Sequence, residues 1–306
     1  MLSCVRSYRF LHLDVFTDHL FGGNQLAVFP DGRGLSSQTM QAIAKEMNFS
    51  ETTFVLPAEQ TGTDMRVRIF TPGSELPMAG HPTIGTTFAL ARIGVIPPGS
   101  DRIVLGLGIG PTPVTMTWTD RDLNFAWMTQ STPTVSRSNL DRACAAAALG
   151  LPESAVVATL PVEVISCGLP YVLVPLVSRE AVDSAVLNRS AYDHLIESAG
   201  TDGVFLFSTE RRGDTATAYS RMFAPALGVH EDPATGSASG PLGCYLVRHR
   251  IVASESAGAM ISLQGVKMGR PSHVHISIGV DGDDIRSVRV GGTSVLAGEG
   301  TLYVPY

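Results

Sequence analysis

The chain has 306 residues, of which 44% are hydrophobic and 16% charged, so it can bury a large core, and its length favours two domains over one. Its formal net charge is -6, and its lysine and arginine residues are scattered. Because a nucleic acid or an anionic membrane would require clustered basic residues, we expect neither as a partner.

Cysteine is sparse in this chain. Cys4, Cys144, Cys167 and Cys244 lie far apart and form no C-x-x-C pair, so we expect no metal site and no disulfide framework. The first ten residues carry charges where a signal peptide needs an apolar block, and no apolar run reaches the roughly 18 residues of a membrane span. The expected location is therefore the cytoplasm.

Alternating and β-branched patterns in the first 128 residues predict strands together with two helices. The first helix, 35–47, is amphipathic and can begin at Ser36 or Ser37. The second helix starts near Pro82 and is apolar on nearly every face as far as Ile93, which indicates a buried helix. The predicted strands are 8–15, 26–29, 52–56, 65–70, 103–107, 114–118 and 124–128.

The rest of the chain shows the same order of elements without repeating the sequence. Helices are expected at 139–149, 191–199 and 238–250, and the last of these is again apolar on several faces. The predicted strands are 162–166, 171–177, 203–207, 219–223, 259–264, 274–278, 287–291 and 300–304. Runs of strands with two main helices in each half argue against a doubly wound sheet. They favour a duplicated α+β unit in which each mixed sheet curls around one helix.

A turn with small residues and one polar side chain precedes each of the two buried helices. The first is Gly80-His81-Pro82-Thr83, and the second is Asp232-Pro233-Ala234-Thr235-Gly236-Ser237. Unpaired N–H groups at a buried helix start can bind an anion. The alternative is structural, because His81 or Ser237 can cap its helix and Asp232 can form an ordinary turn.

Glu51 lies between the end of the first helix and an apolar strand. A lone glutamate at such a junction is usually exposed. If its side chain turns inward instead, desolvation suits it to proton transfer. The sequence alone leaves both possibilities open.

Several short motifs occur in a particular order along the chain. They are Asp14-Val15-Phe16-Thr17, Gly23-Asn24, Asn48-Phe49-Ser50-Glu51-Thr52, Thr71-Pro72, Glu75-Leu76-Pro77-Met78-Ala79-Gly80-His81-Pro82-Thr83, Glu231-Asp232-Pro233-Ala234-Thr235-Gly236-Ser237-Ala238, Gln264-Gly265, Gly269-Arg270 and Gly291-Gly292. Together they resemble the PhzF-like phenazine biosynthesis family, over residues 10–304 or so.

The resemblance implies a diaminopimelate epimerase-like fold of the α+β class. Such a fold has two pseudo-symmetric halves, and each half is a curled, barrel-like mixed sheet around a central buried helix. The implied N-terminal half is 1–128 and carries Glu51 and His81. The implied C-terminal half is 129–292 and carries Asp232 and Ser237. A strand at about 293–306 is expected to return to the first half.

The resemblance also implies a cofactor-independent isomerase similar to trans-2,3-dihydro-3-hydroxyanthranilate isomerase, which moves a proton from C3 to C1 of its ring. By similarity, Glu51 would be the general acid and base that takes the proton and returns it. The substrate would be a small molecule with a carboxylate, and a homodimer is expected by resemblance only. The residues expected to bind the substrate are His81, Asp232, Ser237, Gly80 and Gly236. Glu75 and Glu231 are weaker candidates, for which a structural role is expected.

Two other functions remain open. One is an amino-acid racemase or epimerase acting on another small acid. Such enzymes of this fold use two cysteines, one at each helix start, whereas Ala79 and Gly80 stand at the first start here and Asp232 at the second. Cys244 is expected to pack inside the second buried helix. The other possibility is a non-catalytic protein that binds a small ligand.

Overall fold

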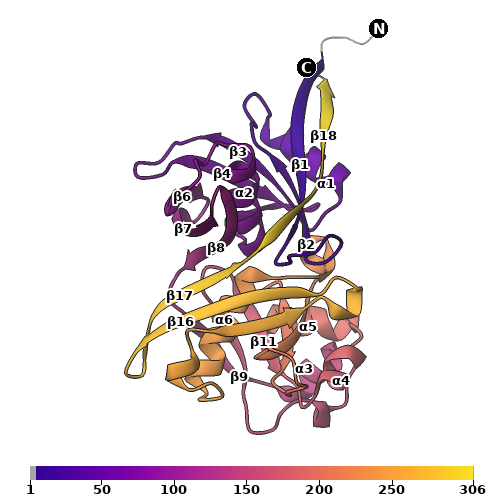
Figure 1. The fold of residues 1–306 in the computed structure, drawn as a ribbon. Helices are drawn as coiled ribbons and strands as arrows, with labels where there is room; N and C mark the ends of the chain where they lie inside the picture. Colours follow the sequence, from indigo (N-terminus) through magenta and orange to yellow (C-terminus); the bar gives the residue numbers. More distant parts are fainter. Residues whose placement is uncertain (1–4, 306) are drawn as a thin grey trace. The chain divides into compact units, whose positions relative to one another are not determined.

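The computed structural model describes residues 5–305, and Cys4 lies outside them. The chain divides into two compact units (Figure 1). Unit 1 comprises residues 1–128 and 291–306, and unit 2 comprises residues 129–290.

In unit 1, strand β1 (Val5–Val15) lies between two antiparallel neighbours, β2 (Asn24–Phe29) and β18 (Ser294–Pro305). The long β1–β18 pair is visible in Figure 1. Helix α1 (Ser37–Met47) connects β2 to its parallel neighbour β3 (Glu51–Pro57). The other elements are β4 (Met65–Phe70), β5 (Glu75–Leu76), α2 (Gly80–Arg92), β6 (Arg102–Leu107), β7 (Gly110–Thr119) and β8 (Asp122–Gln130).

Unit 2 is again a mixed sheet with helices. Its strands are β9 (Thr134–Leu140), β10 (Val162–Ser166), β11 (Pro170–Pro175), β12 (Val204–Ser208), β13 (Ala218–Ala224), β14 (Val229–Asp232), β15 (Met260–Gln264), β16 (Ser272–Asp281) and β17 (Asp284–Gly292). Its helices are α3 (Arg142–Ala148), α4 (Arg179–Ser184), α5 (Arg189–Ala199) and α6 (Gly236–Arg248).

The two units use the same order of strand pairings. In unit 1, β2 and β3 pair in parallel, β3 and β4 are antiparallel, and β4 and β6 are parallel. In unit 2, β11 and β12 pair in parallel, β12 and β13 are antiparallel, and β13 and β15 are parallel. Helix α2 follows β5 in the first series, and α6 follows β14 in the second. The duplicated α+β unit predicted from the sequence pattern is therefore present.

Helices α2 and α6 are each buried over nearly their whole length. A glycine in the middle of each lets the helix approach its sheet closely. A Cβ atom on Gly85 would lie 2.5 Å from Leu26 Cδ2, and one on Gly243 would lie 2.5 Å from Ile276 Cγ2. The prediction of a mixed sheet around a buried helix is thus confirmed in both units. Among the described residues, no helix is both long and apolar enough to cross a membrane.

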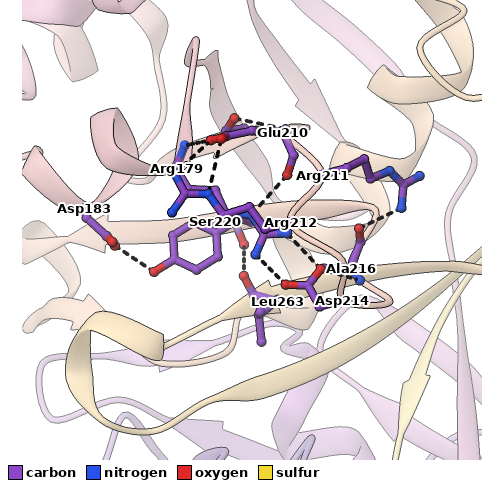
Figure 2. Close-up of polar contacts among 11 residues, drawn as sticks. Arg179, Asp183, Glu210, Arg211, Arg212, Asp214, Ala216, Ser220 and Leu263 are labelled. Atoms are coloured by element: carbon purple, nitrogen blue, oxygen red, sulfur yellow. Dashed lines mark hydrogen bonds and ion pairs between the residues drawn. The ribbon is translucent and has the colours of Figure 1, made fainter.

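A polar cluster in unit 2 joins α4 to the connection between β12 and β13 (Figure 2). The Arg179 guanidinium donates to both carboxylate oxygens of Asp214, at 2.5 and 2.9 Å, and the Arg179 backbone N–H donates to Glu210 Oε2 at 2.8 Å. The same guanidinium lies over the ring of Tyr219, whose hydroxyl donates to Asp183. These contacts hold α4 against β13, the strand that precedes β14 and Asp232.

Candidate active site

Glu51 points inward. Helix α1 ends at Asn48, which adopts the left-handed conformation, and β3 then begins at Glu51 itself. Side chains alternate along a strand, so Glu51 and Thr53 share one face. The Thr53 hydroxyl contacts the Thr86 hydroxyl of α2 at 2.9 Å, so this face is the one covered by the buried helix. The Glu51 side chain is accordingly only 12% exposed, which decides between the two positions that the sequence left open.

His81 lies in the first turn of α2, with its side chain 3% exposed. The cap residue of this helix is Ala79, so His81 does not cap it. Its Nε2 atom lies 3.3 Å from Glu51 Oε2, and its Nδ1 atom lies 3.0 Å from Asn24 Nδ2. Burial lowers the pKa of His81 from 6.5 to about 3, against a smaller opposing effect of a hydrogen bond with the Gln25 backbone. The imidazole is therefore neutral at neutral pH.

Three elements of unit 1 bring these side chains together. Asn24 is the first residue of β2 and Glu51 is the first residue of β3. Since the two strands run parallel, with Leu26 opposite Glu51, their starts lie at the same edge of the sheet. The first turn of α2 reaches this edge and supplies His81. The result is a buried carboxylate beside a neutral imidazole, an arrangement that can accept and return a proton.

Asp232 lies in a turn of unit 2 that is stabilised by side-chain hydrogen bonds. It ends β14 and is buried, and its Oδ2 atom accepts a hydrogen bond from the Thr235 hydroxyl at 2.5 Å. The Gln264 side chain donates to the Asp232 carbonyl at 2.7 Å and accepts from the Thr235 N–H at 2.9 Å. Gly265 follows in the left-handed region, where a Cβ atom would lie 2.3 Å from the Arg270 carbonyl oxygen. Asp232 therefore forms a turn, which was the structural alternative given for it in the sequence analysis. Its carboxylate is held in place by the Thr235 hydroxyl.

Ser237 lies in the first turn of α6 and is buried. The cap residue of α6 is Thr235, so Ser237 does not cap the helix. Its hydroxyl lies 2.7 Å from the hydroxyl of Tyr171, which comes from β11. Gly80 and Gly236 are the first residues of α2 and α6, and both are buried. Within a helix, N–H groups at these first positions have no intrahelical acceptor, so they are available to an anion.

The two weaker candidates have structural roles. Glu75 is paired with Arg68 through both carboxylate oxygens, at 2.7 and 2.6 Å. Glu231 is paired in the same way with Arg221, at 2.8 and 2.9 Å. The Arg221 guanidinium also donates to the Val182 carbonyl at the end of α4. Each glutamate thus neutralises an arginine that joins neighbouring elements.

The described cysteines do not lie at the starts of the two buried helices, α2 and α6. Cys244 is buried inside α6, as expected, and its Sγ atom lies 3.8 Å from that of Cys167 in the core of unit 2. Cys144 is part of α3 and is partly exposed. Among the described residues, no cysteine therefore takes the place that a two-cysteine racemase requires.

Three polar residues that contact predicted site residues, or the turn that carries one, were not singled out in the sequence. Asn24 contacts His81, Tyr171 contacts Ser237, and Gln264 holds the turn that carries Asp232. Gly23-Asn24 and Gln264-Gly265 belong to motifs behind the family resemblance, and this was the only signal available for them. Tyr171 gave no signal, because a tyrosine in a strand is ordinary.

Comparisons with known proteins agree over nearly the whole chain. The family described as "Phenazine biosynthesis-like protein" matches residues 13–300. The trans-2,3-dihydro-3-hydroxyanthranilate isomerase of Pseudomonas aeruginosa is 38% identical over 97% of this chain and 100% of its own length. A PhzF-family phenazine biosynthesis protein of Bacillus anthracis superposes with a TM-score of 0.85 at 25% identity, covering 97% of this chain and 99% of that one.

A more distant structure bears on the fold alone. A hydroxyproline epimerase of Agrobacterium vitis has a TM-score of 0.66 at 13% identity, over 98% of this chain and 94% of that one. The predicted epimerase-like α+β fold is therefore confirmed.

Proposed function

This chain belongs to the phenazine biosynthesis-like protein family and is an isomerase, and we propose that it moves a proton on a small carboxylated substrate without a cofactor. The observation that carries this proposal is the buried Glu51 carboxylate, 3.3 Å from a neutral His81. A desolvated carboxylate has no water shell to lose when it meets a C–H bond, and a neutral neighbour does not weaken it as a base.

We propose that the substrate is trans-2,3-dihydro-3-hydroxyanthranilate or a closely related cyclic amino acid. The support for this choice is the 38% identity to an isomerase named for that compound. Backbone N–H groups at Gly80 or at Gly236 would bind the substrate carboxylate, because the helix dipole favours an anion at a helix start. The amino and hydroxyl groups would bind Asp232 and Ser237, whose side chains are already held in place by Thr235 and Tyr171.

In the proposed reaction, Glu51 takes the proton from C3 of the ring, and the electron pair of that C–H bond moves into the conjugated system. Glu51 then returns the proton to C1 of the ring. This step restores the ionised Glu51 side chain and leaves the substrate as an enol, which becomes a ketone. One carboxylate suffices because both transfers occur on the same face of the ring. Backbone N–H groups at the helix starts would stabilise the negative charge that develops between the two transfers.

Turnover of trans-2,3-dihydro-3-hydroxyanthranilate in deuterated water tests the proposal. We expect ketone formation with partial deuterium incorporation at C1, and we expect Glu51→Gln to lower kcat by about 100- to 10,000-fold, the usual contribution of general acid–base catalysis. Glu46→Gln is the matched control, because Glu46 is an exposed carboxylate in α1 of the same unit.

Wild-type rates of product formation and exchange in Glu51→Gln would show that another group transfers the proton. Tight binding of the substrate with no exchange in any variant would instead indicate a protein that binds a ligand without turning it over.

A further inference from the structure

We propose that Tyr171 is a positioning residue for Ser237, and that it makes the Ser237 hydroxyl a hydrogen-bond donor to an oxygen atom of the substrate. The subsite at the start of α6 then takes a hydroxyl or carboxylate oxygen and rejects an ammonium group. The identity of the substrate rests on the proposed function above. The contact between the two side chains lies entirely within unit 2 and does not depend on the role of Glu51.

The Ser237 hydroxyl is not used by its own helix. A serine inside a helix often donates to the backbone carbonyl four residues earlier. Ser239 does so, with its hydroxyl 2.9 Å from the Thr235 carbonyl oxygen. In the described part of the chain, the hydroxyl of Ser237 instead lies 2.7 Å from the hydroxyl of Tyr171. The helix therefore leaves this hydroxyl available for another purpose.

Tyr171 is held in place by the chain around it. The residue belongs to β11 and is buried. A Cβ atom on Gly203 would lie 2.7 Å from Tyr171 Cδ1, so the ring lies directly against the backbone there. The Thr201 hydroxyl donates to the Pro170 carbonyl at 2.5 Å, which fixes the chain immediately before Tyr171. The phenol oxygen thus meets the start of α6 from a well-packed strand.

The acidity of the two hydroxyls decides the direction of their hydrogen bond. On geometry alone, either group could donate to the other. A phenol is a much stronger acid than an aliphatic alcohol, so its O–H group is the better donor and the alcohol oxygen is the better acceptor. Tyr171 therefore donates to Ser237 Oγ. The hydrogen of the Ser237 hydroxyl is left to point at another acceptor.

That hydrogen needs an acceptor, because Ser237 is only 4% exposed and a buried donor without a partner is destabilising. Ser237 belongs to the first turn of α6, where backbone N–H groups also lack intrahelical acceptors. A ligand oxygen can accept from all of these groups. An ammonium group only donates, so it would oppose them. The Asp232 carboxylate is the acceptor that suits the amino group of the substrate.

Binding of two unreactive aromatic analogues tests the inference without any proton transfer. 3-Hydroxyanthranilate carries the carboxylate, amino and hydroxyl groups of the proposed substrate, and anthranilate lacks the hydroxyl. By calorimetry, we expect Ser237→Ala to weaken the binding of 3-hydroxyanthranilate by about 10-fold and Tyr171→Phe to weaken it by about 3- to 10-fold, the usual range for one hydrogen bond. In the Ser237→Ala background, Tyr171→Phe should have no further effect, since Tyr171 acts through Ser237.

Anthranilate identifies which substrate oxygen is bound. If Ser237→Ala and Tyr171→Phe leave the affinity for anthranilate unchanged, Ser237 donates to the ring hydroxyl. If they weaken the binding of both analogues in parallel, Ser237 donates to the carboxylate. Both results support a donor at this position. In turnover of the proposed substrate, Tyr171→Phe should raise KM more than it lowers kcat, because the hydrogen bond already forms in the ground state.

Tyr245→Phe is the matched control, because it removes the buried contact of another α6 hydroxyl, with the Pro161 carbonyl, and leaves Ser237 untouched. The inference is overturned if Tyr171→Phe leaves the affinity for both analogues unchanged. It is also overturned if Tyr171→Phe weakens binding equally with and without Ser237, or if Tyr245→Phe weakens binding as much.

Failure of the proposed function gives a different pattern. Wild-type protein that binds neither analogue would overturn the proposed substrate and this subsite together. Exchange at the wild-type rate in Glu51→Gln would overturn only the role of Glu51, and the binding measurements would still decide the role of Tyr171.

Discussion

Glu51 Oε2 and His81 Nε2 lie 3.3 Å apart, but the two side chains do not form a salt bridge between full charges. Burial keeps His81 neutral, because its pKa falls to about 3. An imidazolium at this distance would stabilise the carboxylate and make it a poorer base. The neutral ring leaves Glu51 reactive while still restricting where it points.

His81 should make the protein sensitive to mild acid. Its pKa is lower in the folded state, about 3, than its usual value of 6.5, so the unfolded chain binds more protons between these values. The free energy of unfolding should therefore decrease as pH falls below 6.5, by up to about 1.4 kcal/mol per pH unit from this group. Urea unfolding of wild type and His81→Gln between pH 7.5 and pH 4.5 measures the difference. His194→Gln, an exposed change on α5, is the control, and parallel pH dependence in wild type and His81→Gln would contradict the prediction.

Gly265 should be far less tolerant of alanine than Gly269. Both adopt the left-handed region, with φ of 75° and 71°, so alanine is strained at either position by about 1–2 kcal/mol. At Gly265 the new Cβ would also lie 2.3 Å from the Arg270 carbonyl oxygen and 2.6 Å from that of Pro233, whereas at Gly269 nothing lies within 4 Å. We expect Gly265→Ala to destabilise unit 2 by at least about 1–3 kcal/mol more, since the backbone must shift. Denaturant unfolding of the two variants provides the comparison, and equal losses would show that the clash is relieved locally.

Arg179 should contribute far more to stability than Arg189. The Arg179 side chain is 7% exposed and donates hydrogen bonds to both carboxylate oxygens of Asp214 (Figure 2). This contact lowers the pKa of Asp214 to about 2. Arg189 pairs with Asp193 one turn along α5, and both of these side chains are more than half exposed. We expect Arg179→Gln to lower the free energy of unfolding by about 2 kcal/mol or more, since it breaks a largely buried pair, although Asp214 is 38% exposed and partly screened.

Arg189→Gln should change the same free energy by less than about 0.5 kcal/mol, because exposed pairs on a helix contribute little. Chemical unfolding of both variants at the same salt concentration measures the two changes. A similar small effect at both positions would mean that the cluster in Figure 2 is also effectively solvated.

Local sequence patterns predicted most strands and both buried helices, but they failed where distant residues decide the structure. A helix was expected over 139–149, yet α3 begins only at Arg142, capped by Asp141. The residues before it form β9, because Leu140 pairs with Val162 of β10. The strand expected at 300–304 extends over 294–305, since it pairs with β1 along its length. Residues 294–298 of β18 are all half-buried, so this part of the strand lacks the alternation of buried and exposed positions that reveals a strand.

The same distinction applies to the candidate site. Glu51 and His81 could be named from the sequence because motifs surround them. Their approach to 3.3 Å depends on the first turn of α2 reaching the edge of the sheet where β3 begins, which the motifs do not show. Tyr171 could not be named, because its contact with Ser237 joins residues 66 positions apart. Such a partnership depends on which strand lies beside the helix start, and a single sequence does not show this.

The pairing of β1 with β18 has a consequence for how the molecule is made. Unit 2 is one continuous stretch, residues 129–290, whereas unit 1 needs residues on both sides of it. A ribosome therefore releases all of unit 2 before it synthesises the strand that lies against β1 along Val5–Val15. Domains usually fold as units during synthesis, so unit 2 can fold first while the edge of β1 stays open. The half of the molecule that carries Glu51 would then be the last to close.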